Sequence, residues 1–108
     1  MRRPTPALEI ERSDVSFGEL DESNARRRLE AEGFSVTRYD YPPGTSFPDH
    51  KHSIDKKDAV VNGCLLIKSG GREFYLRAGD ALLVPAGTIH SAEVIGNETV
   101  VSLDGTKY

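Results

Sequence analysis

Short segments with alternating side chains, separated by glycine and proline, fill the chain after Gly33. The first, residues 34–41, alternates aromatic or β-branched residues with polar ones, which is typical of a strand with two different faces. Pro42-Pro43-Gly44 breaks this segment. Further strands are expected at 47–52, 57–68, 72–77, 81–84, 89–95 and 99–104. Short strands at this regular spacing predict a closed or sandwiched antiparallel β architecture.

A tight hairpin is expected at the Gly70-Gly71 pair, which lies between two apolar runs. Glycine accepts the positive φ that a two-residue β-turn demands. The apolar positions of the flanking strands then supply the core. We expect that core to include Val60, Leu65, Ile67, Leu76, Leu82 and Val84.

One short helix is expected at about residues 22–32. Residues 21–24 offer N-cap side chains, residues 25–32 are good helix formers, and Gly33 is a natural stop. Residues 1–20 are expected to form an extended arm, and residues 21–108 one domain with its barrel at about 34–105. The apolar side chains of the arm pack either on the domain or on a partner; they are Leu8, Ile10, Val15, Phe17 and Leu20.

Composition excludes several classes of protein. A chain of 108 residues makes one domain, and it has no apolar run long enough to span a membrane. The basic N-terminus lacks the apolar run of a secretion signal. Cys64 is the only cysteine, so no internal disulfide is possible and a cytoplasmic location is expected. The net charge of −3 argues against a nucleic-acid partner.

The spacing and the neighbouring residues of the three histidines of the chain indicate where their rings point. His50 and His52 are two residues apart, and on a strand this spacing puts both imidazoles on one face. His90 follows a turn made by Pro85 and Gly87, which would aim its ring inward. Three converging imidazoles suit a borderline divalent ion and leave coordination positions open for water or substrate.

The spacing of these histidines resembles the two sequence motifs of the cupin superfamily, and the chain is similar to its small single-domain bacterial members. The first stretch has five residues between Gly44 and His50, one before His52, and a closing Gly63. The second has five residues between Gly79 and Pro85, one before Gly87 and two before His90.

This resemblance implies an all-β fold, a small antiparallel jelly-roll barrel with one short N-terminal helix. It implies that His50, His52 and His90 bind a divalent metal ion such as Fe, Mn, Ni or Zn, with no other cofactor. It also implies a small-molecule ligand or substrate inside the barrel. Because unpaired strand edges need covering, we expect a homodimer that uses the N-terminal arm.

Two positions depart from the pattern of the superfamily. Lys56 stands where the fourth ligand, a glutamate, is usual, and Val94 stands where an asparagine is usual. Lysine does not ligate, so the site either has three histidines, as in some cupin dioxygenases, or is metal-free with Lys56 binding an anion. Lys56 could instead point outward as a solvated charge, or act as a general base if it is desolvated. Asp58 would share a face with Lys56, as a further ligand or as its ion-pair partner.

Two classes of function fit these residues. One is a small-molecule enzyme of the oxygenase, isomerase or lyase type that uses the metal. The other is a non-catalytic binding or sensor protein. The residues do not decide whether the protein is an enzyme, and no catalytic residue is assigned.

Overall fold

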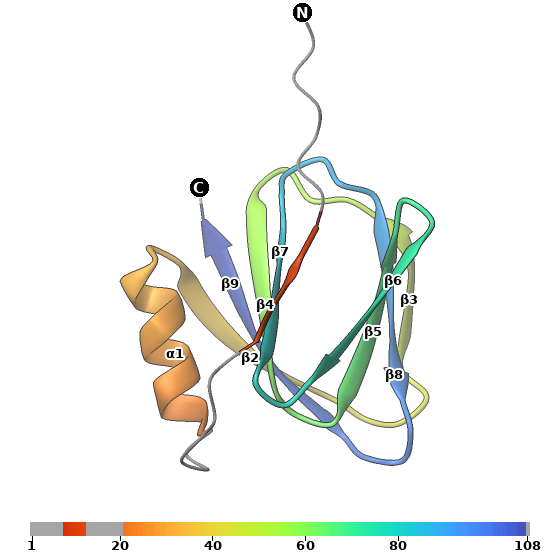
Figure 1. The fold of residues 1–108 in the computed structure, drawn as a ribbon, viewed down its shortest axis with the longest axis horizontal. Helices are drawn as coiled ribbons and strands as arrows, with labels where there is room; N and C mark the ends of the chain where they lie inside the picture. The colour runs from red at the N-terminus through yellow and green to blue at the C-terminus, as the bar shows by residue number, and fades with distance from the viewer. Residues whose placement is uncertain (1–7, 13–20, 108) are drawn as a thin grey trace, which may run out of the picture.

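Two antiparallel sheets face each other and enclose one core in the computed structural model, which describes residues 8–12 and 21–107 (Figure 1). One sheet has the strand order β1-β7-β4-β9-β2, and the other has the order β3-β8-β5-β6. The strands are β1 (Ile10–Arg12), β2 (Ser35–Tyr41), β3 (Ser46–His50), β4 (Asp55–Asn62), β5 (Cys64–Ser69), β6 (Arg72–Arg77), β7 (Asp80–Val84), β8 (His90–Ile95) and β9 (Val100–Lys107). The predicted all-β jelly roll with one short helix is confirmed.

The space between the sheets is filled by alternate residues of the strands. All six residues predicted for the core are at most 3% exposed. Burying an aliphatic side chain of this size stabilises the fold by about 1.5–3 kcal/mol. The inner cluster consists of Val60, Leu65, Ile67, Phe74, Leu76, Leu82, Val84, Val94 and Val100.

The helix α1 (Glu22–Ala31) covers the outer face of the five-stranded sheet, beside β2 and β9 (Figure 1). Its N-cap Asp21 accepts a hydrogen bond of 2.7 Å from the backbone N–H of Asn24. Leu29 anchors the helix, at 2% exposed, against Phe34, Ala59 and Leu103. The predicted helix is confirmed to within one residue at its C-terminal end.

The single strand predicted at 57–68 is wrong, because the chain turns at Gly63, which has a φ of +80°. β4 ends at Asn62 in the five-stranded sheet, and β5 begins at Cys64 in the four-stranded sheet. Apolar residues continue on both sides of the turn because both strands are buried. The hydrophobic pattern therefore does not show where β4 ends and β5 begins. Only Gly63 marks this boundary in the sequence.

The predicted hairpin at Gly70-Gly71 is confirmed. Ser69 and Arg72 are paired across the turn, and the two glycines have φ values of +58° and +77°. Both values lie in the left-handed region that glycine enters without a steric penalty. The hairpin joins β5 to β6 at the edge of the four-stranded sheet.

Part of the predicted N-terminal arm is a strand. β1 pairs with β7, with Ile10 opposite Leu82, and Leu8 and Ile10 pack against the inner core. The rest of the arm, residues 1–7 and 13–20, lies outside the described residues, and so do its apolar side chains after Arg12. The homodimer that the arm was expected to form stays a prediction.

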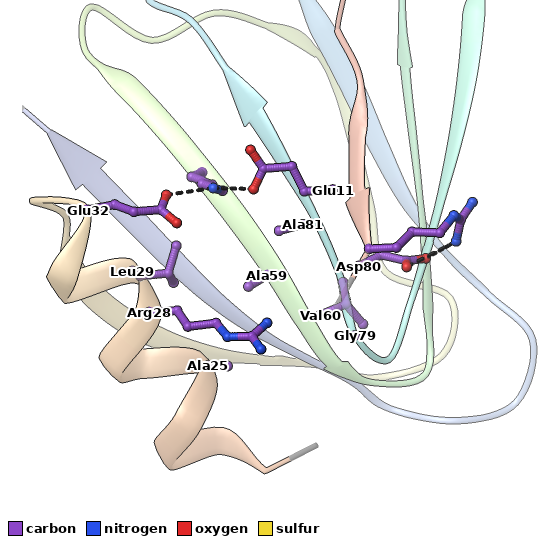
Figure 2. Close-up of a pocket in the computed structure, with 12 residues that line it drawn as sticks. Glu11, Ala25, Arg28, Leu29, Glu32, Ala59, Val60, Gly79, Asp80 and Ala81 are labelled. Carbon is purple, nitrogen blue, oxygen red and sulfur yellow. Dashed lines mark hydrogen bonds and ion pairs between the residues drawn. The ribbon is translucent and has the colours of Figure 1, made fainter. Parts of the chain in front are cut away.

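Lys57 joins three elements on the outer side of the barrel, where it pairs with Glu11 and Glu32, both labelled in Figure 2. Its ammonium group pairs with Glu11 of β1 and with Glu32, which follows α1, at 2.6 Å from Glu32 Oε1. Burial alone lowers the pKa of Lys57, but the hydrogen bonds to the two glutamates outweigh it and raise the pKa. The lysine therefore stays charged and holds β1 and the end of α1 to β4.

No helix among residues 8–12 and 21–107 has the length and hydropathy that crossing a membrane requires.

Candidate metal centre

Three histidines from two distant segments of the chain converge at one end of the barrel. His50 ends β3, His52 lies in the loop after it, and His90 begins β8. Each offers one ring nitrogen, and these atoms lie within 4.8 Å of one another. His50 and His90 face each other across the β3–β8 pair. The structure thus brings together the three residues that the sequence predicts as metal ligands.

Backbone carbonyls orient two of the three rings. The Nδ1 atom of His50 lies 2.7 Å from the carbonyl oxygen of Pro48, and that of His90 lies 2.9 Å from the carbonyl oxygen of Thr88. In each case the carbonyl can only accept, so Nδ1 carries the proton. Nε2 of each ring is then left with its lone pair free, which is the form that binds a metal.

The turn before His90 is tied to the loop that carries His52. The backbone N–H of Gly87 donates to the carbonyl of His52 at 2.8 Å, and that of Thr88 donates to the carbonyl of Pro85 at 3.1 Å. Gly87 has a φ of +81°, a conformation that side-chain-bearing residues rarely adopt. Pro85 and Gly87 therefore fix the distance between the segment that carries His52 and the segment that carries His90. This role explains why Pro85 and Gly87 occur in the second sequence motif.

The surroundings favour neutral imidazole. Burial lowers the pKa of His52, and the nearby Lys56 ammonium lowers it further. Burial also lowers the pKa of His90, although its hydrogen bond to Thr88 acts in the opposite direction. Metal coordination needs neutral rings, so the site is prepared for it at neutral pH.

A cavity of about 400 Å³ opens beside the three histidines. Three aromatic residues form one wall: Tyr41 stacks on Tyr39, with ring centroids 5.9 Å apart, and meets Phe47 edge-on at 5.3 Å. Leu65, Ile67 and Ala92 supply an apolar floor. The volume is within the range of small-molecule sites, at about 300–1,000 Å³.

Lys56 faces this cavity and is not a solvated surface charge, since its side chain is 18% exposed. Its Nζ lies 3.4 Å from Oδ2 of Asp104, on the neighbouring strand β9. Asp58 lines the same cavity, as expected from its position two residues after Lys56. The ion-pair partner of the lysine is therefore Asp104, which lies 48 residues further along the chain and was not predicted from the sequence.

Asp58 and Asp104 sit directly opposite each other on β4 and β9. Ser102 donates a hydrogen bond of 2.7 Å to Oδ1 of Asp104, whereas Oδ1 of Asp58 is buried and has no hydrogen-bond partner among the described residues. Burial first, and the neighbouring Asp104 second, raise the pKa of Asp58 well above its usual range. Ser102 and Asp104 are polar residues at inward positions of β9. This feature of the sequence could have identified them as residues of the cavity.

Comparison with known proteins identifies the same architecture. The sequence model of a family described as "Cupin domain" matches residues 37–105. That stretch holds all three histidines and both aspartates of the cavity. No curated protein matched the chain.

Solved structures resemble the fold at low sequence identity. KdgF from Halomonas sp. is 22% identical with a TM-score of 0.61, over 69% of this chain and 70% of that one. A cupin-2 domain protein from Shewanella frigidimarina is 20% identical with a TM-score of 0.60, over 69% and 71%. A cupin superfamily protein from Desulfitobacterium hafniense is 16% identical with a TM-score of 0.62, over 99% and 83%. At these identities the likeness concerns the fold alone.

Proposed function

The chain belongs to the cupin superfamily, and from that premise we propose that it binds one divalent metal ion and uses it on a small molecule held in the barrel. The proposed ligands are His50, His52 and His90. The observation that carries the proposal is their convergence, with ring nitrogens within 4.8 Å of one another. A barrel that served only as a scaffold would not need three such rings at one point.

The donor set fits the metal ions expected from the sequence. Imidazole nitrogen suits Fe, Mn, Ni and Zn, and two of the rings already have their Nδ1 atoms engaged by carbonyls. Three ligands leave coordination positions open for a substrate in the adjacent cavity. When bound, such a metal acts as a Lewis acid or oxygen-activating centre, which suits oxygenation, isomerisation or lyase-type proton transfer.

The protein's own residues would hold the substrate and limit access of water. The aromatic wall of Tyr39, Tyr41 and Phe47 offers a flat apolar surface close to the histidines. Lys56 does not ligate, but its pairing with Asp104 compensates its charge, which reduces its repulsion of a metal cation. The lysine is therefore compatible with the three-histidine centre.

A metal-free binding or sensor protein is the second candidate. In that role Lys56 would receive an anion. Its ammonium group already has a carboxylate partner in Asp104, and an incoming anion would have to compete with that buried ion pair. The geometry therefore favours the metal-dependent function.

The test is metal analysis of protein purified without an affinity tag, followed by titration of the metal-free protein with Mn, Fe, Ni and Zn. We expect one ion per chain for at least one metal. The control is the triple variant His50→Gln, His52→Gln and His90→Gln, which keeps polar side chains of similar size and should bind none. Protein that contains no metal and takes up none would leave the metal-free binding protein as the better account.

A further inference from the structure

Lys56 has more hydrogen-bond donors than the described residues use. An ammonium group has three N–H donors, and the hydrogen-bond partner of its Nζ among those residues is Oδ2 of Asp104, at 3.4 Å. The Lys56 side chain is 18% exposed and lines the cavity beside the histidines. Because a desolvated donor without an acceptor is costly, a molecule that brings an acceptor to Lys56 is stabilised in this cavity.

The charge of Lys56 is already balanced. Asp104 pairs with it and also accepts a hydrogen bond of 2.7 Å from Ser102. Burial first, and Asp104 second, raise the pKa of Asp58 well above its usual range, and the same two causes raise the pKa of Tyr41. Both groups therefore stay protonated at neutral pH, and the cavity has no net charge while its histidines are neutral. An uncharged acceptor can use the donors of Lys56 without breaking the ion pair, whereas a carboxylate would bring in an uncompensated negative charge.

The aromatic wall supplies an apolar surface for the rest of the ligand. Tyr39 and Phe47 line the cavity and are 44% and 37% exposed, so a ligand can reach both rings. Tyr41 lies nearly parallel to Tyr39, at 5°, and edge-on to Phe47, at 73°. Aromatic rings prefer stacked or edge-on partners, so a ring placed against these side chains gains contacts of both kinds. The wall therefore favours a flat aromatic body.

We propose that the cavity takes an uncharged aromatic molecule, whose ring rests on the aromatic wall and whose carbonyl or hydroxyl oxygen accepts a hydrogen bond from Lys56. Lys56 is then the specificity-determining residue of the cavity, and Asp104 is the positioning residue that holds its ammonium group. The inference rests on the proposed function only for the place of reaction, since the lysine and the wall need no bound metal. It gives the substrate class of that function as small aromatic ketones, amides or alcohols without a formal charge.

The test uses the full-length, metal-free, ¹⁵N-labelled protein at about pH 8, where histidine side chains are neutral. The probes are benzamide, benzoate, which has nearly the same shape but a negative charge, and toluene, which has no oxygen. We expect benzamide to shift the backbone amide signals of β2 and β4 around the cavity. Its affinity should exceed that of toluene by about tenfold, the effect of one hydrogen bond from a charged donor. Benzoate should bind no more tightly than benzamide.

Two variants test the role of the lysine. Lys56→Met removes the donors and keeps an unbranched side chain, and the double variant Lys56→Met with Asp104→Asn also avoids a buried carboxylate without its cation. In both, the preference for benzamide over toluene should disappear while toluene still binds. The control Lys68→Met removes an exposed lysine outside the cavity and should keep the preference. Tighter binding of benzoate than of benzamide, equal binding of benzamide and toluene to the original protein, or a preference that persists in the double variant would overturn the proposal.

A parallel titration with Zn²⁺ keeps this result distinct from the proposed function. If the protein prefers benzamide but binds no metal, the role of Lys56 stands and the metal-dependent function fails. If Zn²⁺ binds and the preference for benzamide is absent, the metal centre stands and the role of Lys56 fails.

Discussion

His50 and His90 lie directly opposite each other on adjacent antiparallel strands, with ring centroids 4.3 Å apart. This pairing brings together two residues 40 positions apart in the sequence, whereas His52 joins them from the loop after β3. Both paired rings have Nδ1 at a backbone carbonyl. The geometry of the proposed centre is therefore set by the sheet before any metal binds.

Replacing His90 by alanine is expected to abolish stoichiometric metal binding without unfolding the barrel. The change removes one of three nitrogen ligands, and two imidazoles hold a divalent ion far less tightly. His90 is 4% exposed, so a cost of about 1–3 kcal/mol in the free energy of unfolding is also expected. Metal analysis and circular dichroism of the same sample check both effects. Retention of one ion per chain would remove His90 from the ligand set.

Acid is expected to weaken both the fold and metal binding. The pKa values of His52 and His90 are lowered by burial, so the unfolded chain takes up protons at a higher pH than the folded protein does. The stabilisation from keeping these rings neutral is present above a pH of about 6.5 and is lost as the pH falls through their lower folded values. Metal affinity should fall in the same range.

Urea unfolding of metal-free protein from about pH 7 to pH 5 measures this effect, with metal affinity determined at the same pH values. The variant with His52→Gln and His90→Gln is the control and should lack the loss of stability on acidification that these two rings cause, while the opposite contribution of Asp58 remains. An equal slope in the variant and the original protein would assign the pH dependence to other groups.

Lys56→Glu is expected to strengthen metal binding and to weaken the metal-free fold. The new carboxylate stands where cupins usually carry their fourth ligand, but it also leaves Asp104 without its cation and adds a third acidic group to the cavity. A loss of about 1–3 kcal/mol is expected without metal. Thermal unfolding with and without metal, together with chelator competition, measures both effects. Lys56→Gln is the control, and equal affinity in the two variants would mean that residue 56 does not reach the metal.

Asp58→Asn is expected to stabilise the protein at neutral pH. Because burial and Asp104 raise the pKa of Asp58, the folded state binds its proton more tightly than the unfolded state does. The contribution of Asp58 to stability is therefore greatest below its unfolded pKa of about 4 and falls as the pH rises toward the folded value, opposite in sign to the contribution of the two histidines. An amide has no such titration and can donate to Asp104, so a gain of about 1–3 kcal/mol at pH 7 is expected. Urea unfolding at pH 4 and pH 7 checks that the gain grows with pH.

Gly63→Ala is expected to destabilise the barrel more than Gly44→Ala does. Both glycines have positive φ, of +80° and +89°, so each alanine incurs a conformational cost of about 1–2 kcal/mol. A Cβ at Gly63 would also lie 3.0 Å from the carbonyl oxygen of Thr99, whereas a Cβ at Gly44 meets nothing within 4 Å. The difference between the two unfolding free energies isolates the contact between the β4–β5 turn and the start of β9. Equal losses would show that this contact is relaxed without cost.

Local features of the chain determined much of the fold and the outline of the site. The alternation of residues 35–41, the paired glycines at 70–71 and the capped segment at 22–31 act over a few residues. Such patterns can be read directly because strand and helix periods are local properties of the backbone. The shared face of Lys56 and Asp58 follows from the same period of two.

Only the tertiary structure decided which charges meet inside the barrel. Lys56 pairs with Asp104, 48 residues further on, because β4 and β9 are neighbours in a particular antiparallel register. A shift of one residue would turn Asp104 to the other face of the sheet. The sequence alone determined that the chain is a cupin-like barrel with three histidines in position. The register of distant strands then placed Asp104 beside Lys56 and opposite Asp58, because pairing across a sheet depends on long-range packing and not on neighbours in the chain.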